Sequence, residues 1–138
     1  MNPALVLRLP VAILTLVIAS CGNDQCTVIS MAVDPSAGTA DHNALPPGNQ
    51  QQFFSDGTMT SNCPAPPMET PVRRGLQDVT WTVSDTTNVS ISNNTQDGTL
   101  GVATCLGATA GPATVTATLP AEMNHGNRLV STGTITCH

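Results

Sequence analysis

The chain has 138 residues with a formal net charge of −5, and 40% of its residues are hydrophobic, 9% charged and 2% aromatic. Its basic residues are four arginines, and it contains no tyrosine. A nucleic-acid-binding surface needs basic side chains to displace counterions and aromatic rings to stack on bases, so we expect no nucleic-acid partner. The length predicts one domain, and the low charge at this hydrophobicity argues against a disordered tail.

Residues 1–20 have the layout of a cleaved secretory signal peptide. Arg8 and the amino terminus supply positive charge, residues 9–19 form an apolar run, and the run ends in small residues. The alternative is a membrane-spanning anchor. It is disfavoured because the run is about half as long as the ~20 apolar residues that a spanning helix needs.

The residues that follow the apolar run resemble the lipobox of bacterial lipoproteins. Ile18, Ala19 and Ser20 precede Cys21, which places an aliphatic residue and two small residues before a cysteine. The resemblance implies that the signal is cut before Cys21 and that Cys21 then carries three acyl chains, enough for stable membrane anchoring. Because residue 22 is Gly and not Asp, the resemblance favours the outer membrane of the bacterial cell envelope.

The cysteine count fits an exported protein that carries one lipidated cysteine. Five cysteines are present, so four remain if Cys21 carries lipid. Four cysteines allow two disulfides in three connectivities, whereas free buried thiols are disfavoured in an oxidising compartment. No CxxC pair is present, which argues against zinc-ribbon and thioredoxin-like sites. The remaining four are Cys26, Cys63, Cys105 and Cys137.

The chain after residue 21 predicts short strands. Helical periodicity is missing, and Thr, Val, Gly and Pro, which favour strands and turns, are abundant. Inward-facing residues that alternate with polar ones are, in chain order, Ile29, Met31 and Val33; Val79, Trp81 and Val83; Val89 and Ile91; Val115, Ala117 and Leu119; and Gly133, Ile135 and Cys137. Turns are predicted at residues 46–48, 56–57, 85–88, 93–98 and 111–112. Many short strands at this spacing predict an all-β sandwich or barrel.

The order of these motifs resembles bacterial immunoglobulin-like domains of the group 2 type. The resemblance covers residues 27–137 and implies an Ig-like β-sandwich of about seven short antiparallel strands. It departs from the family in a second strand that looks short and in an inserted proline-rich loop at residues 63–75. The matching segments are residues 48–53 (GNQQQF), 55–58 (SDGT, a hairpin in the family), 78–85 (DVTWTVSD), 89–91 (VSI), 101–105 (GVATC) and 111–117 (GPATVTA).

The strand path that this resemblance implies also predicts the disulfides. Cys26 precedes the first strand and Cys63 follows the second, at the same end of the sandwich. Cys105 and Cys137 lie near the ends of two strands that finish at the opposite end, and the alternation points both side chains inward. We therefore expect the pairs Cys26–Cys63 and Cys105–Cys137. The same path places the loop of residues 93–98 at the end that holds Cys26.

Residues that often mark functional sites have structural interpretations in this sequence. Trp81 could be a sugar-stacking platform, but its place between Val79 and Val83 predicts a core anchor. No histidine pair has a metal-ligand spacing, and the carboxylates fit turns better than a calcium site, so we expect no metal and no cofactor. These residues are His42, His125 and His138, and Asp34, Asp41, Asp56, Asp85 and Asp97.

No catalytic pattern is present in the sequence. It lacks a G-x-S-x-G elbow and a triad context, and Glu69 and Glu122 do not suggest a carboxylate pair, so we do not expect an enzyme. The signal peptide (residues 1–20), the lipid anchor and tether (21–26) and the Ig-like domain (27–138) together predict a membrane-anchored, non-enzymatic surface lipoprotein. Its module would serve adhesion, envelope contact or spacing, with an unknown protein or glycan partner. The alternative is a small periplasmic glycan- or metal-binding protein.

Overall fold

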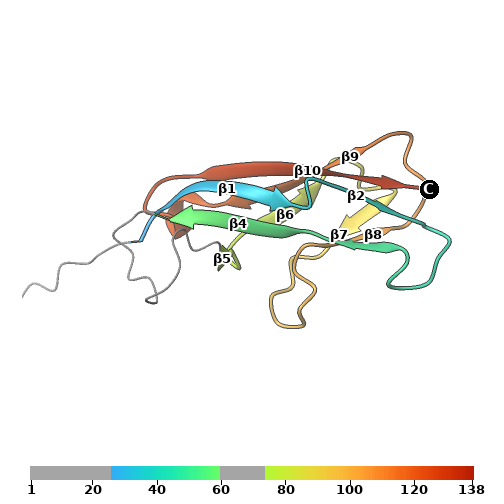
Figure 1. Cartoon of the computed structure of the whole chain (residues 1–138), viewed down its shortest axis with the longest axis horizontal. Coiled ribbons are helices and arrows are strands. Elements are labelled where there is room, and N and C mark those ends of the chain that lie inside the picture. The colour runs from blue at the N-terminus through green and yellow to red at the C-terminus, as the bar shows by residue number, and fades with distance from the viewer. Residues whose placement is uncertain (1–25, 60–73) are drawn as a thin grey trace, which may run out of the picture.

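Strands make up nearly all the regular structure in the computed structural model, which describes residues 26–59 and 74–138 (Figure 1). The elements are β1 (Val28–Asp34), β2 (Ala37–Ala40), β3 (Gln50–Gln52), β4 (Phe54–Met59), β5 (Arg74–Gly75), β6 (Thr80–Val83), β7 (Val89–Ile91), β8 (Val102–Cys105), β9 (Ala113–Leu119), the short 3-10 helix η1 (Ala121–Met123) and β10 (Leu129–Cys137).

The strands form the two layers of a β-sandwich. One layer has the order β2-β10-β9-β6, in which β2 runs parallel to β10 and the other pairs are antiparallel. In the other layer, β4 pairs with β1 and β5, and β3 pairs with β8, which pairs with β7. β3 and β4 are consecutive parts of one strand path, so the two smaller sheets continue into each other. This order matches an immunoglobulin-type sandwich whose first strand is split between the layers.

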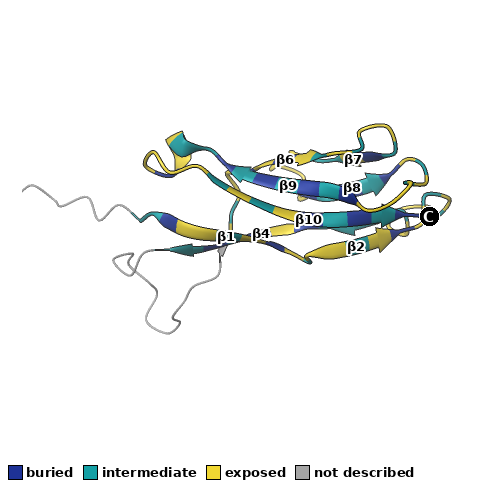
Figure 2. Cartoon of the chain, turned by 90° about the horizontal axis from the view of Figure 1, so that it is seen from above, coloured by how far each residue is buried: buried dark blue, intermediate teal, exposed yellow. Residues whose placement is uncertain are grey.

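The predicted alternation is confirmed most clearly in β9 and β10, the two central strands of their sheet. In β9 every second residue is buried, from Ala113 to Leu119, and in β10 Gly133, Ile135 and Cys137 are buried. Successive side chains of a strand point to opposite faces, so the threonines between them face outward. Figure 2 shows buried positions along β9 and in the C-terminal half of β10.

The turn predicted at residues 56–57 is wrong. Asp56 and Gly57 continue β4, where they pair with Ala32 and Met31 of β1. A Cβ atom at Gly57 would lie 2.9 Å from Cδ1 of Leu76, so this glycine allows a close approach and does not form a turn. The expectation of a short second strand is wrong for the same reason.

The predicted inward face of β1 is only partly correct. Val33 is buried and Met31 is half-buried, but Ile29 is 59% exposed and Val28 is buried in its place. The pairing register with β4 shifts between Val28 and Ser30. An extra residue in one strand reverses the facing of the residues beyond it, so this irregularity turns Ile29 outward.

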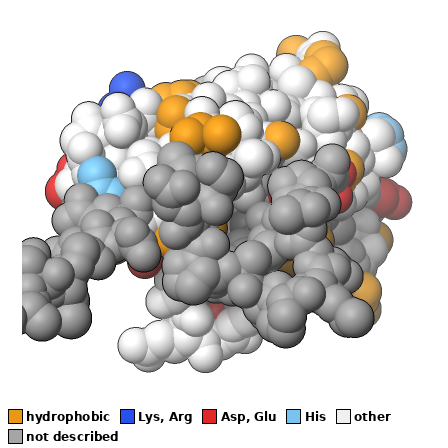
Figure 3. Space-filling model, turned by 60° about the vertical axis from the view of Figure 1, so that its left-hand side comes forward, with side chains coloured by type: hydrophobic (Ala, Val, Ile, Leu, Met, Phe, Trp, Pro, Cys, Tyr) orange, Lys and Arg blue, Asp and Glu red, His pale blue; other side chains and the backbone are white. Residues whose placement is uncertain are grey.

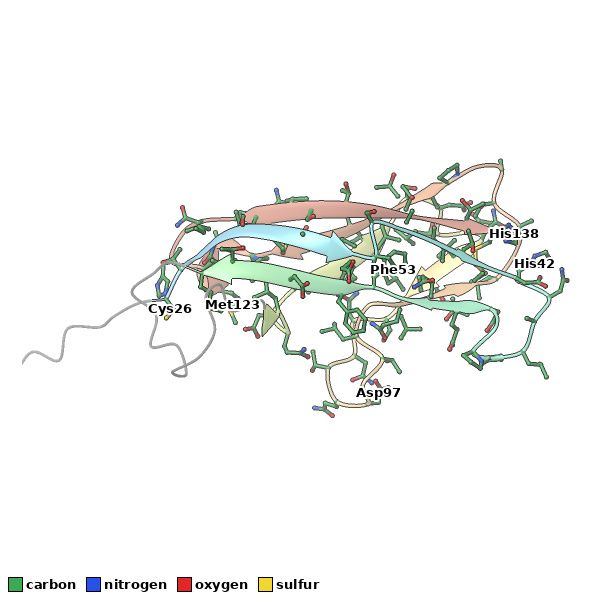
Figure 4. All side chains as sticks on the ribbon, in the orientation of Figure 1. Cys26, His42, Phe53, Asp97, Met123 and His138 are labelled. Carbon is green, nitrogen blue, oxygen red and sulfur yellow. A yellow bond between two sulfur atoms is a disulfide. The ribbon has the colours of Figure 1, made fainter. Side chains whose placement is uncertain are left out.

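The loop of residues 93–98 does not lie at the end of the sandwich that holds Cys26. Figure 4 places Asp97 about midway along the molecule, on a loop that hangs from one side. The flanking strands explain this position. β7 and β8 are short and lie in the half of the layer that contains β3. Their connection therefore turns back before it reaches the end of the sandwich that holds Cys26.

Cys105 and Cys137 form a disulfide, as the sequence predicts. Their Cα atoms are 5.7 Å apart, and the bond joins β8 of one layer to β10 of the other. Cys26 is also disulfide-bonded, and neither Cys105 nor Cys137 is its partner. Its expected partner, Cys63, lies outside the described residues, so that pairing stays a prediction.

The double variant Cys105→Ala/Cys137→Ala should lower the free energy of unfolding by about 2–4 kcal/mol, because the bond restricts a loop in the unfolded chain. The sequence separation of the two cysteines is 32 residues. Urea unfolding of the oxidised protein would measure the change. A loss below about 0.5 kcal/mol would contradict this account of the cross-layer bond.

Gly101→Ala should destabilise the protein by about 3 kcal/mol. Gly101 has φ of +78°, and a Cβ atom there would collide with the carbonyl oxygen of Phe53 and lie 3.2 Å from Cε2 of Trp81. The control is Gly111→Ala, because Gly111 has open space around its Cα and should tolerate alanine within about 0.5 kcal/mol. Thermal unfolding would compare the two variants, and equal melting temperatures would contradict the prediction.

Candidate functional site

A hollow of about 150 Å³ opens on one side of the sandwich, where β3 gives way to β4. Its walls come from three parts of the chain. Residues 52–55 and 75–77 supply one wall, Trp81 of β6 lies at the hollow from the opposite layer, and Thr95, Gly98 and Leu100 of the β7–β8 loop complete the lining. The loop that carries Asp97 in Figure 4 is this same loop.

Two buried polar atoms without hydrogen-bond partners belong to residues that line the hollow. Ser55 is 3% exposed and Trp81 is 2% exposed. Within residues 26–59 and 74–138, neither the Ser55 hydroxyl nor the Trp81 indole N–H has a partner. A buried polar group normally finds one, and leaving it unpaired costs about 1–3 kcal/mol. Both atoms are completely covered by the protein, so these two groups do not face the hollow.

Asn93 holds the Trp81 backbone in place. The Trp81 N–H donates to Asn93 Oδ1 at 2.6 Å, and Asn93 Nδ2 donates to the Trp81 carbonyl at 2.9 Å. β6 is an edge strand of its sheet, and in the described part of the chain it pairs with β9 alone. The side-chain amide of Asn93 therefore takes the place of a neighbouring strand and ties the β7–β8 loop to the residue beneath the hollow.

The β7–β8 loop is also fixed by its own side chains. Asp97 Oδ1 accepts from the Thr99 N–H at 2.9 Å and from the Thr99 hydroxyl at 2.6 Å, and Asp97 Oδ2 accepts from Asn94 Nδ2 at 2.7 Å. These bonds, first of all the one from the Thr99 hydroxyl, hold the pKa of Asp97 below its ordinary value. Asp97 is thus the turn residue that the sequence predicts.

Gln52 and the two phenylalanines shape the inner wall. Gln52 Nε2 donates to the carbonyls of Phe53 and Leu100, each at 2.7 Å, which fixes the end of the loop against the strand path. Phe53 is fully buried, whereas Phe54 is 54% exposed. Among the residues that line the hollow, Phe54 is therefore an exposed aromatic residue.

The histidines do not gather into a site in the described parts of the chain. His42 and His138 meet at the opposite end from Cys26 (Figure 4), where the His42 N–H donates to the His138 carbonyl at 3.0 Å and His42 Nδ1 lies 2.7 Å from the same oxygen. His125 is exposed in the loop after η1. Within residues 26–59 and 74–138, no three His, Cys, Asp or Glu side chains lie close enough to hold a metal ion.

The remaining aspartates divide between turns and strands. Asp41 Oδ1 accepts from the Asn43 N–H at 2.9 Å, as in a turn. Hydrogen bonds from Asn88, first of all from its side chain, lower the pKa of Asp85 in the turn before β7. The prediction of turns is wrong for Asp34 and Asp56, which lie in β1 and β4 because these strands are longer than the turn signals suggest.

Several sequence predictions lie outside the described residues. They concern the lipidated Cys21, Cys63, Glu69 and most of the proline-rich loop of residues 63–75. In the described segments, no helix has the length and apolarity needed to cross a membrane. Trp81 itself lies in the core cluster with Phe53 and the buried residues of β9.

No protein-family model matches the chain, and no curated protein matches it significantly.

The sequence does not predict the positions of Ser55 at the hollow and of Asn93 against Trp81. Ser55 lies in the SDGT segment, which the resemblance interprets as a hairpin, so its side chain looks exposed. Asn93 begins a segment of turn-forming residues, and its contact with Trp81 depends on tertiary structure. The one sequence feature near the hollow that stands out is the single tryptophan, Trp81.

Asn93→Ala should lower the free energy of unfolding by about 1–3 kcal/mol, because the Trp81 N–H and carbonyl would lose their partner. Urea unfolding followed by the fluorescence of Trp81, the single tryptophan, would measure it. The control is Asn43→Ala, at an exposed asparagine in the β2–β3 loop, which should change stability by less than about 0.5 kcal/mol. Equal effects at the two positions would contradict the bridging role of Asn93.

Proposed function

We propose that this protein is a membrane-anchored, non-enzymatic surface lipoprotein of the bacterial cell envelope, held by lipidated Cys21 and most simply placed in the outer membrane. Its Ig-like module serves adhesion, envelope contact or spacing. The lipobox-like residues 18–21 and the Ig-type strand order support this proposal. The partner is a protein or a glycan.

The main support for this proposal is that β1 begins at one end of the sandwich. β1 begins at Val28, so residues 22–27 join it to Cys21 and span at most about 20 Å. The described chain starts at one end of an elongated sandwich, and His42 and His138 lie at the other end (Figures 1 and 4). A lipid on Cys21 would hold the β1 end close to the membrane and direct the far end away from it.

The surface and the cross-layer disulfide agree with a display or spacing role. The Cys105–Cys137 bond ties the two layers together near the far end. In the view of Figure 3, the described side chains that are visible show hydrophobic groups in small separate patches and few charged groups. A module with a display or spacing role needs a stable fold more than it needs a catalytic site.

One feature supports the glycan-binding part of the alternative function. The hollow is lined by the apolar side chain of Phe54 and by the polar residues Gln77 and Thr95, and it lies on the side of the sandwich and not at its tip. A small periplasmic glycan binder is therefore the second candidate. Both functions can belong to one anchored protein.

Cys21→Ser should abolish lipidation, and the variant should leave the membrane fraction or accumulate with its signal uncut. Mass spectrometry of the detergent-extracted protein should find acyl chains on an N-terminal Cys21 in the original sequence. Asn23→Ser, two residues further on, is the matched control and should be processed and lipidated normally. An unmodified Cys21, or cleavage at another position, would overturn the anchoring proposal.

A further inference from the structure

We propose that the end of the sandwich that holds Cys26 is a lipid-contacting surface, which touches the bilayer that holds the acyl chains of Cys21. This inference rests on the proposed lipid anchor and deepens it, because a second contact gives the anchored protein a fixed orientation on the membrane. The contacting side chains, here called the basal patch, are Ile29, Met123 and Val130.

Three segments bring exposed hydrophobic side chains to this end of the molecule. Ile29, near the start of β1, is 59% exposed, Met123, the last residue of η1, is 53% exposed, and Val130, near the start of β10, is 50% exposed. Figure 4 shows Met123 and Cys26 at the same end. Single exposed hydrophobic residues are common on protein surfaces, but a group of them on neighbouring segments indicates a contact surface.

Asn124 holds these segments together. Its Oδ1 accepts from the Val28 N–H at 2.8 Å, and its Nδ2 donates to the carbonyls of Val28 and Asn127, each at 2.9 Å. Ile29 and Met123 are the sequence neighbours of the bonded pair Val28 and Asn124, so their backbones stay close to each other. β10 begins directly after this loop and completes the patch.

The loop that carries Met123 is fixed by its own backbone. The Met123 N–H donates to the Pro120 carbonyl at 3.1 Å, and the Gly126 N–H donates to the Ala121 carbonyl at 2.8 Å. The next residue, Asn124, is 1% exposed, so the loop buries this amide and leaves Met123 at the surface. A side chain on a fixed backbone loses little conformational entropy when a bilayer covers it.

The bilayer is the surface that the tether brings to the patch. Residues 22–27 separate Cys21 from the start of β1 and span at most about 20 Å. A tethered surface meets the membrane at a high effective concentration, so even a weak contact is populated. The patch is too small to bind a membrane by itself, and the acyl chains supply the affinity. The patch therefore sets the orientation of a protein that is already anchored.

The charges near the patch also suit a phospholipid surface. Arg128 is exposed in the loop between η1 and β10, and a guanidinium can form two parallel hydrogen bonds to a phosphate. Glu122 of η1 offsets part of this positive charge. At the far end, the exposed Asp41 precedes His42, and its carboxylate would be repelled by anionic headgroups. The end that holds Cys26 is therefore the better membrane contact of the two.

Met123 provides a native probe of this contact. Hydrogen peroxide transfers one oxygen atom to an exposed methionine sulfur and leaves as water, whereas a covered methionine is protected. The lipidated protein, reconstituted in vesicles of phosphatidylethanolamine and phosphatidylglycerol, would be treated with peroxide, and mass spectrometry would follow the Met123 peptide. The mature chain (residues 21–138) with Cys21→Ser, mixed with the same vesicles, is the unanchored reference. Met123 should be oxidised about fivefold more slowly in the anchored protein.

Two double variants of the anchored protein test whether the patch itself makes the contact. Ile29→Glu/Val130→Glu keeps Met123 and should restore its oxidation to the unanchored rate, because a charge is costly to move out of water. Leu45→Glu/Leu106→Glu is the matched control, at aliphatic residues that are 86% and 59% exposed outside the patch, and should keep the slow rate. All four positions are at least half exposed, so the melting temperatures should stay close to the original.

Each other outcome overturns the proposal. Equal rates with and without the anchor would show that the bilayer does not cover Met123, and a slow rate in both would show that the protein itself covers it. A slow rate that persists in Ile29→Glu/Val130→Glu would show shielding without contact by the patch. The mass of the N-terminal peptide reports acylation in the same sample. An unmodified Cys21 overturns the anchor and this inference together, whereas an acylated Cys21 with fast Met123 oxidation overturns this inference alone.

Discussion

The close approach of Phe53 and Gly101 is the contact on which the rest of the structure depends. The Phe53 N–H donates to the Gly101 carbonyl at 3.0 Å, and the missing side chain of Gly101 leaves room for the Phe53 carbonyl and the Trp81 ring. At this point the long strand path breaks into β3 and β4 and changes partners, from β8 on one part to β1 and β5 on the other. Phe53 is thereby fully buried in the core, and its neighbour Phe54 faces solvent.

Two edge strands of the sandwich are covered by asparagine side chains. Asn93 bonds to the N–H and carbonyl of Trp81 on the edge strand β6. Asn124 does the same for Val28, accepting from its N–H at 2.8 Å and donating to its carbonyl at 2.9 Å. An amide side chain reproduces the pairing of a peptide group, so each edge residue is satisfied without a further strand. The hollow lies beside the edge strand β6. It opens there because β8 pairs with β3 and the short β5 pairs with β4, on different halves of the strand path.

The sequence predicts what local alternation controls and misses what tertiary contacts control. The inward residues of β9 and β10 follow from a period of two along strands with two well-defined faces. The Cys105–Cys137 bond follows from the strand path that the Ig-like resemblance implies. Asp56-Gly57 looks like a turn, but Gly57 is required by the approach of Leu76, which is distant in sequence. The inward position predicted for Ile29 is wrong because the register shift between β1 and β4 leaves no signal in the amino-acid composition. The candidate site could not be predicted, since its polar groups come from segments that only the fold brings together.

The distribution of unsatisfied polar atoms connects the fold to the site. In the described part of the chain, three buried side-chain atoms have no hydrogen-bond partner, on Asn49, Ser55 and Trp81, and the last two residues line the same hollow. Replacing Ser55 by alanine would remove one of these costs with a single substitution, and a core whose aromatic residues are Phe53 and Trp81 has little stability to spare. Both atoms are completely covered by the protein, and their residues lie next to the point where the strand path changes partners. Their missing hydrogen bonds are therefore a cost of packing at this junction.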